Sequence, residues 1–142
     1  MRTILTFATI LIFFSFPSHA SDGPKLGTNY VLVDKFCADG SEPLEKPGTF
    51  KDQLTIQFNE KTMIVSFKDL PGTFSLDYRI EGNNLTTMMS DGTVLATGTM
   101  RMAGPLLIWI NDLPANKERA AKICPNGSHI VTIYRRQNAQ NR

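Results

Sequence analysis

Short segments in which apolar and polar residues alternate run through most of this chain, and they restrict its fold more than any other feature. Residues typical of turns interrupt these segments about every ten residues. Successive side chains of a β-strand point to opposite faces, so this alternation indicates strands with one buried face. Helical periodicity is nearly absent. The pattern predicts an all-β protein built from short antiparallel strands.

Eight segments fit this pattern: residues 29–37, 54–58, 62–67, 73–80, 85–89, 93–101, 106–110 and 129–135. One short, charged helix is expected over residues 113–122, before the last strand. Most connections are short enough to join antiparallel neighbours. Eight strands are enough to close an up-and-down barrel, which has no exposed edge, whereas the alternative, a sandwich, leaves edges to protect. We therefore predict an eight-stranded antiparallel barrel with one short helix.

The N-terminus has the features of a secretory signal peptide. Arg2 supplies a positive charge, an apolar run follows over residues 4–14, and Ser18 and Ala20 have the spacing that signal peptidase recognises. A membrane anchor is the alternative, but the run is shorter than the roughly 20 residues of a spanning helix. We expect cleavage of residues 1–20, a single domain over 21–136 and a polar tail over 137–142. The mature protein is then exported, periplasmic or extracellular, without stable membrane insertion.

Cys37 and Cys124 are the only cysteines, one near each end of the expected domain. An isolated even pair in an oxidising compartment indicates a disulfide, with catalytic or metal-binding thiols as the alternatives. A bridge between the first strand and the approach to the last strand also agrees with a closed barrel.

The residues that usually carry chemistry do not form a recognisable constellation. The expected mature chain has one histidine, His129, whereas a zinc site needs three or four ligands. Ser128, His129 and Asp112 contain the residue types of a hydrolytic triad, but triads are recognised by geometry. Charged residues of both signs are interspersed, without the basic face of a nucleic-acid-binding protein. We expect no enzyme activity, metal, cofactor or nucleic-acid partner.

Three phrases resemble those of lipocalin-like (calycin) domains. They are the opening segment over residues 26–30, the strand-turn-strand segment over residues 78–86, and the ending of residues 124–127 with Tyr134 and Arg135. The resemblance implies a small exported barrel that holds a ligand in its interior.

The barrel interior is the candidate binding site. In the strand over 93–101 the charge of Arg101 places the alternate face, with Ala96 and Gly98, toward the inside. These small residues leave space that either aromatic side chains or a ligand fill. A glycine that bends the strand is the structural alternative. The candidate ligand-binding residues are Phe74, Leu76, Tyr78, Ala96, Gly98 and Met100.

Two functions remain open after these arguments. The first is an exported binding protein for a small apolar or amphipathic ligand. The second is a protein-interaction module, such as an inhibitor of a lysozyme-type enzyme, that acts through the long loop over residues 38–50.

Overall fold

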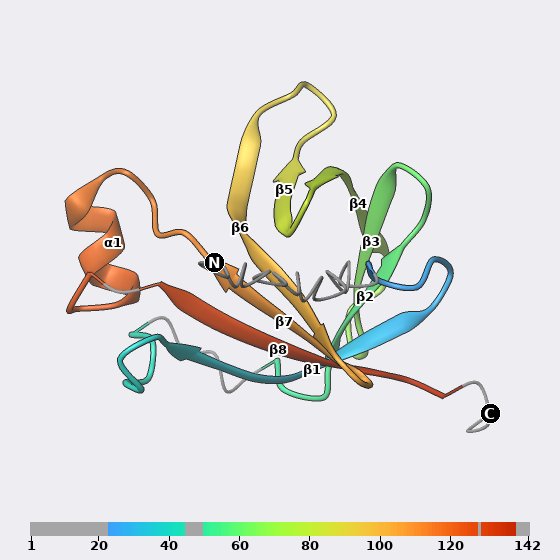
Figure 1. The fold of residues 1–142 in the computed structure, drawn as a ribbon, viewed down its shortest axis with the longest axis horizontal. Helices are drawn as coiled ribbons and strands as arrows, with labels where there is room; N and C mark the ends of the chain where they lie inside the picture. The colour runs from blue at the N-terminus through green and yellow to red at the C-terminus, as the bar shows by residue number, and fades with distance from the viewer. Residues whose placement is uncertain (1–22, 45–49, 128, 139–142) are drawn as a thin grey trace, which may run out of the picture.

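The structure is a computed structural model that describes residues 23–44, 50–127 and 129–138. The expected signal peptide, residues 1–20, lies outside the described residues. Eight strands form one closed antiparallel barrel in which each strand pairs with its neighbours in sequence and the first pairs with the last (Figure 1). The strands are β1 (Asn29–Cys37), β2 (Leu54–Phe58), β3 (Thr62–Phe67), β4 (Thr73–Glu81), β5 (Asn84–Met88), β6 (Val94–Ala103), β7 (Leu106–Asn111) and β8 (Ile130–Arg136). The predicted eight-stranded barrel is confirmed.

The ends of several elements differ from the expected ones by one or two residues. The largest difference among the strands is at β6, which continues to Ala103 rather than ending at Arg101. Ala103 still pairs with Leu106, because Gly104, with φ of 58°, makes a two-residue turn possible.

The one helix, α1 (Lys117–Ile123), precedes β8 as expected but begins four residues later than predicted. Pro114 disfavours helical backbone at Leu113. Asn116 is the N-cap, and its side chain accepts a hydrogen bond from the backbone N–H of Arg119 at 3.1 Å. No helix in the described part of the chain is long and apolar enough to cross a membrane.

Strands β1 and β8 close the barrel along a seam that contains one β-bulge. Leu32 pairs with Tyr134 and Asp34 pairs with Ile133, so Val33 is an extra residue in β1. Because side chains alternate along a strand, this extra residue reverses the faces of the residues that follow it. Lys35 therefore shares the inner face with Leu32.

One end of the barrel, called here the closed end, is filled by aromatic side chains. The Phe58 ring lies edge-on to the rings of Tyr30 and Tyr78, with centroids 6.2 and 5.2 Å away. The Tyr30 hydroxyl accepts a hydrogen bond from the Lys25 backbone N–H at 2.8 Å, and the Tyr78 hydroxyl donates to the Asn59 carbonyl. Tyr30 and Phe58 are completely buried, so this end is a packed core.

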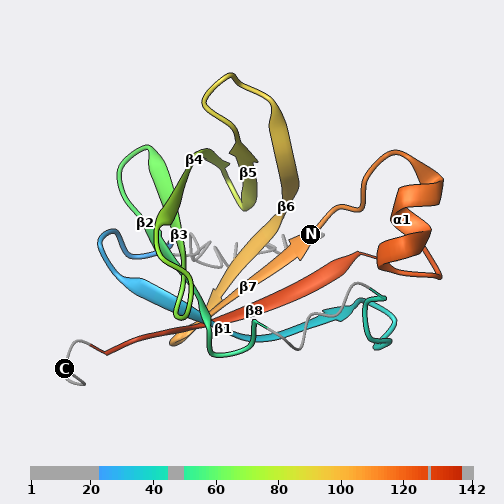
Figure 2. The same cartoon turned by 180° about the vertical axis from the view of Figure 1, so that it is seen from behind.

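The opposite end, called here the open end, carries the four connections β1–β2, β3–β4, β5–β6 and β7–β8. In both views α1 lies on the same side of the barrel as the loop that follows β1 (Figures 1 and 2). Of the exposed large hydrophobic side chains in the described ranges, all except Leu26 belong to this end. They are Leu44, Phe50, Leu70, Phe74, Met89, Val94 and Leu95, and we call them the apolar rim.

Candidate functional site

A cavity of about 310 Å³ enters the barrel from the open end. Its apolar lining residues are Leu32, Phe50, Leu54, Ala96 and Ile130. Its lining residues with a polar or charged group are Lys35, Trp109, Asn111, Thr132 and Tyr134. The polar groups come from the adjacent strands β1, β7 and β8, whereas Leu54 and Ala96 come from β2 and β6. The cavity thus has one wall that combines polar and apolar groups and another that is apolar.

Three of the polar residues form one row across the sheet. Lys35 pairs with Thr132, and Thr132 pairs with Trp109, so the three side chains lie on the inner face at the same level. Asn111 stands two pairs nearer the open end, and its side-chain amide donates a hydrogen bond to the Thr132 hydroxyl at 3.2 Å. Thr132 is buried, and Lys35 is half-buried.

The β-bulge determines which charge faces the cavity. Without Val33 as an extra residue, Asp34 would face inward and Lys35 outward. In the structure the Asp34 side chain instead accepts a hydrogen bond from the Lys35 backbone N–H at 2.9 Å, on the exposed face. Bulges at barrel rims commonly redirect a side chain in this way.

Two buried ring residues, Trp109 and Tyr134, also line this wall. Trp109 is 6% exposed, and its indole Nε1–H is buried without a hydrogen-bond partner in the described part of the chain. Such a buried, unsatisfied donor costs about 1–3 kcal/mol. Burial also raises the pKa of the Tyr134 hydroxyl above its ordinary value, which keeps this side chain a neutral phenol.

The residues that we predicted from the sequence to bind a ligand are distributed among the cavity, the core and the apolar rim. Ala96 lines the cavity. Leu76 and Tyr78 are half-buried against the core cluster, and Met100 is buried within it. Phe74 is 61% exposed and belongs to the apolar rim. Strand β4 contributes no residue to the lining of this cavity.

Gly98 allows two strands to approach each other closely. A Cβ atom at this position would lie 2.1 Å from the Ile110 carbonyl oxygen and 2.7 Å from the Asn111 Cα of β7. The glycine therefore serves the close packing of β6 against β7.

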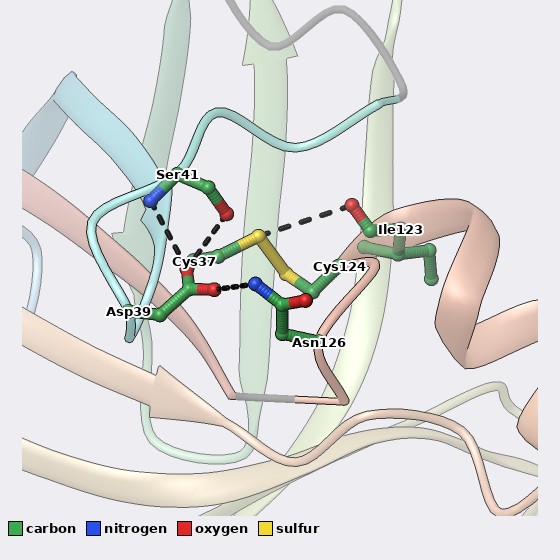
Figure 3. Close-up of a disulfide and its surroundings, with 6 residues drawn as sticks. All are labelled: Cys37, Asp39, Ser41, Ile123, Cys124 and Asn126. Atoms are coloured by element: carbon green, nitrogen blue, oxygen red, sulfur yellow. Dashed lines mark hydrogen bonds between the residues drawn. A yellow bond between two sulfur atoms is a disulfide. The ribbon is translucent and has the colours of Figure 1, made fainter.

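A disulfide joins the end of β1 to the segment after α1 beside the open end (Figure 3). The Cα atoms of Cys37 and Cys124 are 5.8 Å apart, and both residues are fully buried. The predicted bridge is confirmed. The backbone N–H of Leu44 also donates to the carbonyl of Ile123 at 3.0 Å, so the described part of the 38–50 loop is held against the helix. Disulfides of this kind are typical of oxidising compartments.

Asp39 ties the same loop to the turn that follows Cys124 (Figure 3). Its carboxylate accepts hydrogen bonds from the Ser41 hydroxyl at 2.6 Å, the Asn126 amide at 2.6 Å and the Ser41 backbone N–H at 3.0 Å. These bonds favour the ionised form. They lower the pKa of Asp39 from 3.8 to about 2, with the Ser41 hydroxyl as the largest contributor.

We expect the Asp39 bonds to make stability depend on pH. A pKa that is lower in the folded state stabilises the protein above the ordinary value, and this stabilisation disappears as pH falls through the folded pKa. For Asp39 the free energy of unfolding should fall between about pH 4 and about pH 2. Asp39→Asn should flatten this part of the profile in urea unfolding at several pH values.

The control for this experiment is Glu42→Gln, which removes an exposed carboxylate from the same loop. Glu42 has no hydrogen bond to any residue that the structure describes. A profile for Asp39→Asn that matches the profiles of the wild-type and control proteins would contradict the assigned role of Asp39.

The acid and base residues near β8 form a surface pair. His129 Nε2 lies 3.4 Å from Asp112 Oδ1, and the other oxygen of Asp112 accepts a hydrogen bond from the Thr97 hydroxyl at 2.8 Å. Both members of the pair are more than half exposed. Ser128 lies outside the described residues. Over the ranges that the structure describes, no group of three or more His, Cys, Asp or Glu residues is arranged to hold a metal ion.

Comparison of the chain with protein-family models, curated protein sequences and solved structures finds no match.

Proposed function

We propose that this protein is an exported, lipocalin-like barrel that binds a small apolar or amphipathic ligand in the cavity at its open end. The observation that carries the proposal is a cavity of about 310 Å³ whose lining combines Leu32, Leu54 and Ala96 with a few polar groups. Binding sites for small molecules are typically concave and mostly apolar, with a small number of polar groups that orient the ligand.

The difference between the two ends of the barrel supports this proposal. Aromatic rings fill the closed end, whereas the apolar rim surrounds the open end. The Phe67 ring contacts the rings of Phe50 and Phe74, with centroids 5.2 and 6.3 Å away. An apolar ligand that enters from this side meets apolar surface before it reaches the cavity.

Trp109 provides a direct test because it is the only tryptophan and lines the cavity. A ligand that enters the cavity should displace water near the indole and change its fluorescence. We expect saturable changes with alkyl probes such as 1-decanol and decanoate. Native mass spectrometry of freshly purified protein should show a small-molecule adduct. Absence of both signals would contradict the proposed function.

Ala96→Leu is the matched variant, because Ala96 lines the cavity on strand β6. The added methylenes should occupy the cavity, abolish the fluorescence response to 1-decanol and leave the free energy of unfolding unchanged or higher. If the interior had no such space, the same change would destabilise the protein by about 1–3 kcal/mol.

Ala103→Leu serves as the control for that experiment. It adds the same side chain to β6 at an exposed position, which alternation places on the outer face. The control should retain the response to 1-decanol. Equal losses in both variants would contradict the location of the site.

The apolar rim favours a second candidate function, a protein-interaction module such as an inhibitor of a lysozyme-type enzyme. Exposed Leu44 and Phe50 flank the part of the 38–50 loop that lies outside the described residues, residues 45–49. Inhibition of such an enzyme by the purified protein, together with an unresponsive Trp109, would favour this second candidate over the first.

A further inference from the structure

We propose that the ligand is an amphipathic anion whose acidic head group pairs with Lys35 inside the barrel. This inference rests on the proposed function, because it assumes that the cavity at the open end binds a small molecule. It adds the charge and the orientation of that molecule.

Lys35 is a half-buried residue whose positive charge has no negatively charged partner among the described residues. Its side chain lines the cavity, and it forms no ion pair with a residue that the structure describes. The Lys or Arg ion pairs within the described ranges, Arg79–Glu81 and Lys122–Glu118, involve side chains that are more than half exposed. Taking an ammonium group partly out of water is unfavourable unless an anion accompanies it.

Three acidic side chains near Lys35 in sequence or at the open end have other partners. Asp34 faces outward and accepts the Lys35 backbone N–H. Asp39 accepts hydrogen bonds from Ser41 and Asn126, and Asp112 binds Thr97 and His129. A ligand anion would supply the charge that these carboxylates do not bring into the cavity.

Thr132, which pairs with Lys35 and also lines the cavity, is a donor as well. The Thr132 hydroxyl accepts from Asn111, which leaves its own proton available for donation. An ammonium and a hydroxyl on one wall match a group that only accepts hydrogen bonds, as an ionised carboxylate does. An alcohol or an amine would bring a donor of its own.

The remainder of the cavity fits the apolar part of such a molecule. Leu54 and Ala96 come from strands other than those that carry the donors, and Leu32 lies two pairs deeper than Lys35 on β1. The volume of about 310 Å³ is at the lower end for small-molecule sites, which favours a single alkyl chain or a small ring system. The apolar rim continues this surface to the outside.

The test compares three probes of one chain length, decanoate, 1-decanol and decyltrimethylammonium, each below its micelle concentration. Affinity is measured from the fluorescence of Trp109 and checked by calorimetry. We expect decanoate to bind at least about tenfold more tightly than 1-decanol, because a hydrogen bond to a charged group exceeds a neutral one by roughly that factor. The cationic probe should bind most weakly. Equal affinity for the three probes, or a preference for 1-decanol or the cation, would overturn the proposal.

Substitution of Lys35 tests which residue causes the preference. Lys35→Met keeps most of the apolar stem and removes the charge, so decanoate should bind about 10- to 100-fold more weakly while 1-decanol changes little. Lys35→Arg should retain the preference for decanoate. Lys68→Met, which removes an exposed charge from the β3–β4 connection at the same end, is the control and should behave as the wild-type protein does. An unchanged ratio of decanoate to 1-decanol affinity in Lys35→Met would overturn the assignment.

The results separate this inference from the proposed function. Binding of all three probes without preference would reject the anionic head group and retain a small-ligand carrier. Absence of binding by any of the probes, together with no adduct in native mass spectrometry, would reject both. If Lys35→Met does not fold, the preference of the wild-type protein among the three probes still tests whether the ligand has an anionic head group.

Discussion

Replacing both cysteines, in the variant Cys37→Ala/Cys124→Ala, is expected to lower the free energy of unfolding by about 4–5 kcal/mol. The bridge closes a loop with a sequence separation of 87, and in the loop-entropy model such a long loop strongly restricts the unfolded chain. Single domains are stable by about 5–15 kcal/mol, so the variant should retain only a small margin. Alanine avoids placing a hydroxyl at two fully buried positions. Urea unfolding of the variant and the wild-type protein measures the difference.

The wild-type protein under reducing conditions is the matched control for the disulfide. It should lose a similar free energy of unfolding, whereas the double variant should not respond to the reductant. A double variant as stable as the oxidised wild-type protein would contradict the expected contribution of the bridge.

Gly98→Ala should be the most damaging single substitution among those considered, with a loss of about 3 kcal/mol or more. The new Cβ would meet the backbone of Ile110 and Asn111, not the end of a flexible side chain. Strand β7 cannot easily move away, because its other edge is paired with β8. The midpoint and free energy of thermal or urea unfolding report the effect.

Gly23→Ala provides the comparison, because Gly23 has open space at its Cβ position and no positive φ. It measures the effect of a glycine-to-alanine change on the unfolded chain alone, which is small. If Gly98→Ala and Gly23→Ala had similar stabilities, the close approach of β6 and β7 would not constrain the fold.

The strands were predictable because local pattern and turn chemistry agree in this chain. In β2 strict alternation places Ile56 and Phe58 on one face, and both are buried there. The start of α1 was less predictable, because charged residues around Lys117 suggest a helix without marking its first turn. The cap is made by Asn116, and only the geometry of the chain distinguishes it from the preceding residues.

The cavity was not predictable in the same way. Where consecutive residues are all apolar, the sequence pattern does not indicate which side chains point into the barrel. The run from Tyr30 to Val33 contains no polar residue that would reveal a bulge, so the inward position of Lys35 could not be derived. The same holds for Trp109, which stands in the continuous apolar run of β7.

The arrangement of strands across the barrel is a second reason why the cavity could not be predicted from the sequence. Alternation correctly indicated that Ala96 and Met100 share the inner face of β6, since Ala96 lines the cavity and Met100 is buried in the core. It does not indicate which strands lie opposite, because that depends on how the sheet closes. The structure places Ala96 in one cavity with Leu32 and Leu54.

The pairing of the first strand with the last also sets the order in which the protein can be assembled during synthesis. The hairpins from β2 to β7 involve neighbouring segments, and they can form before the seam does. The seam cannot be completed until all of β8, which ends at Arg136, is present, because β1 pairs with β8 along one of its edges. Cys37 has no disulfide partner until Cys124, 87 residues further along the chain, has been made. A chain that stops before β8 exposes two unpaired strand edges, those of β1 and β7, to pairing with other chains.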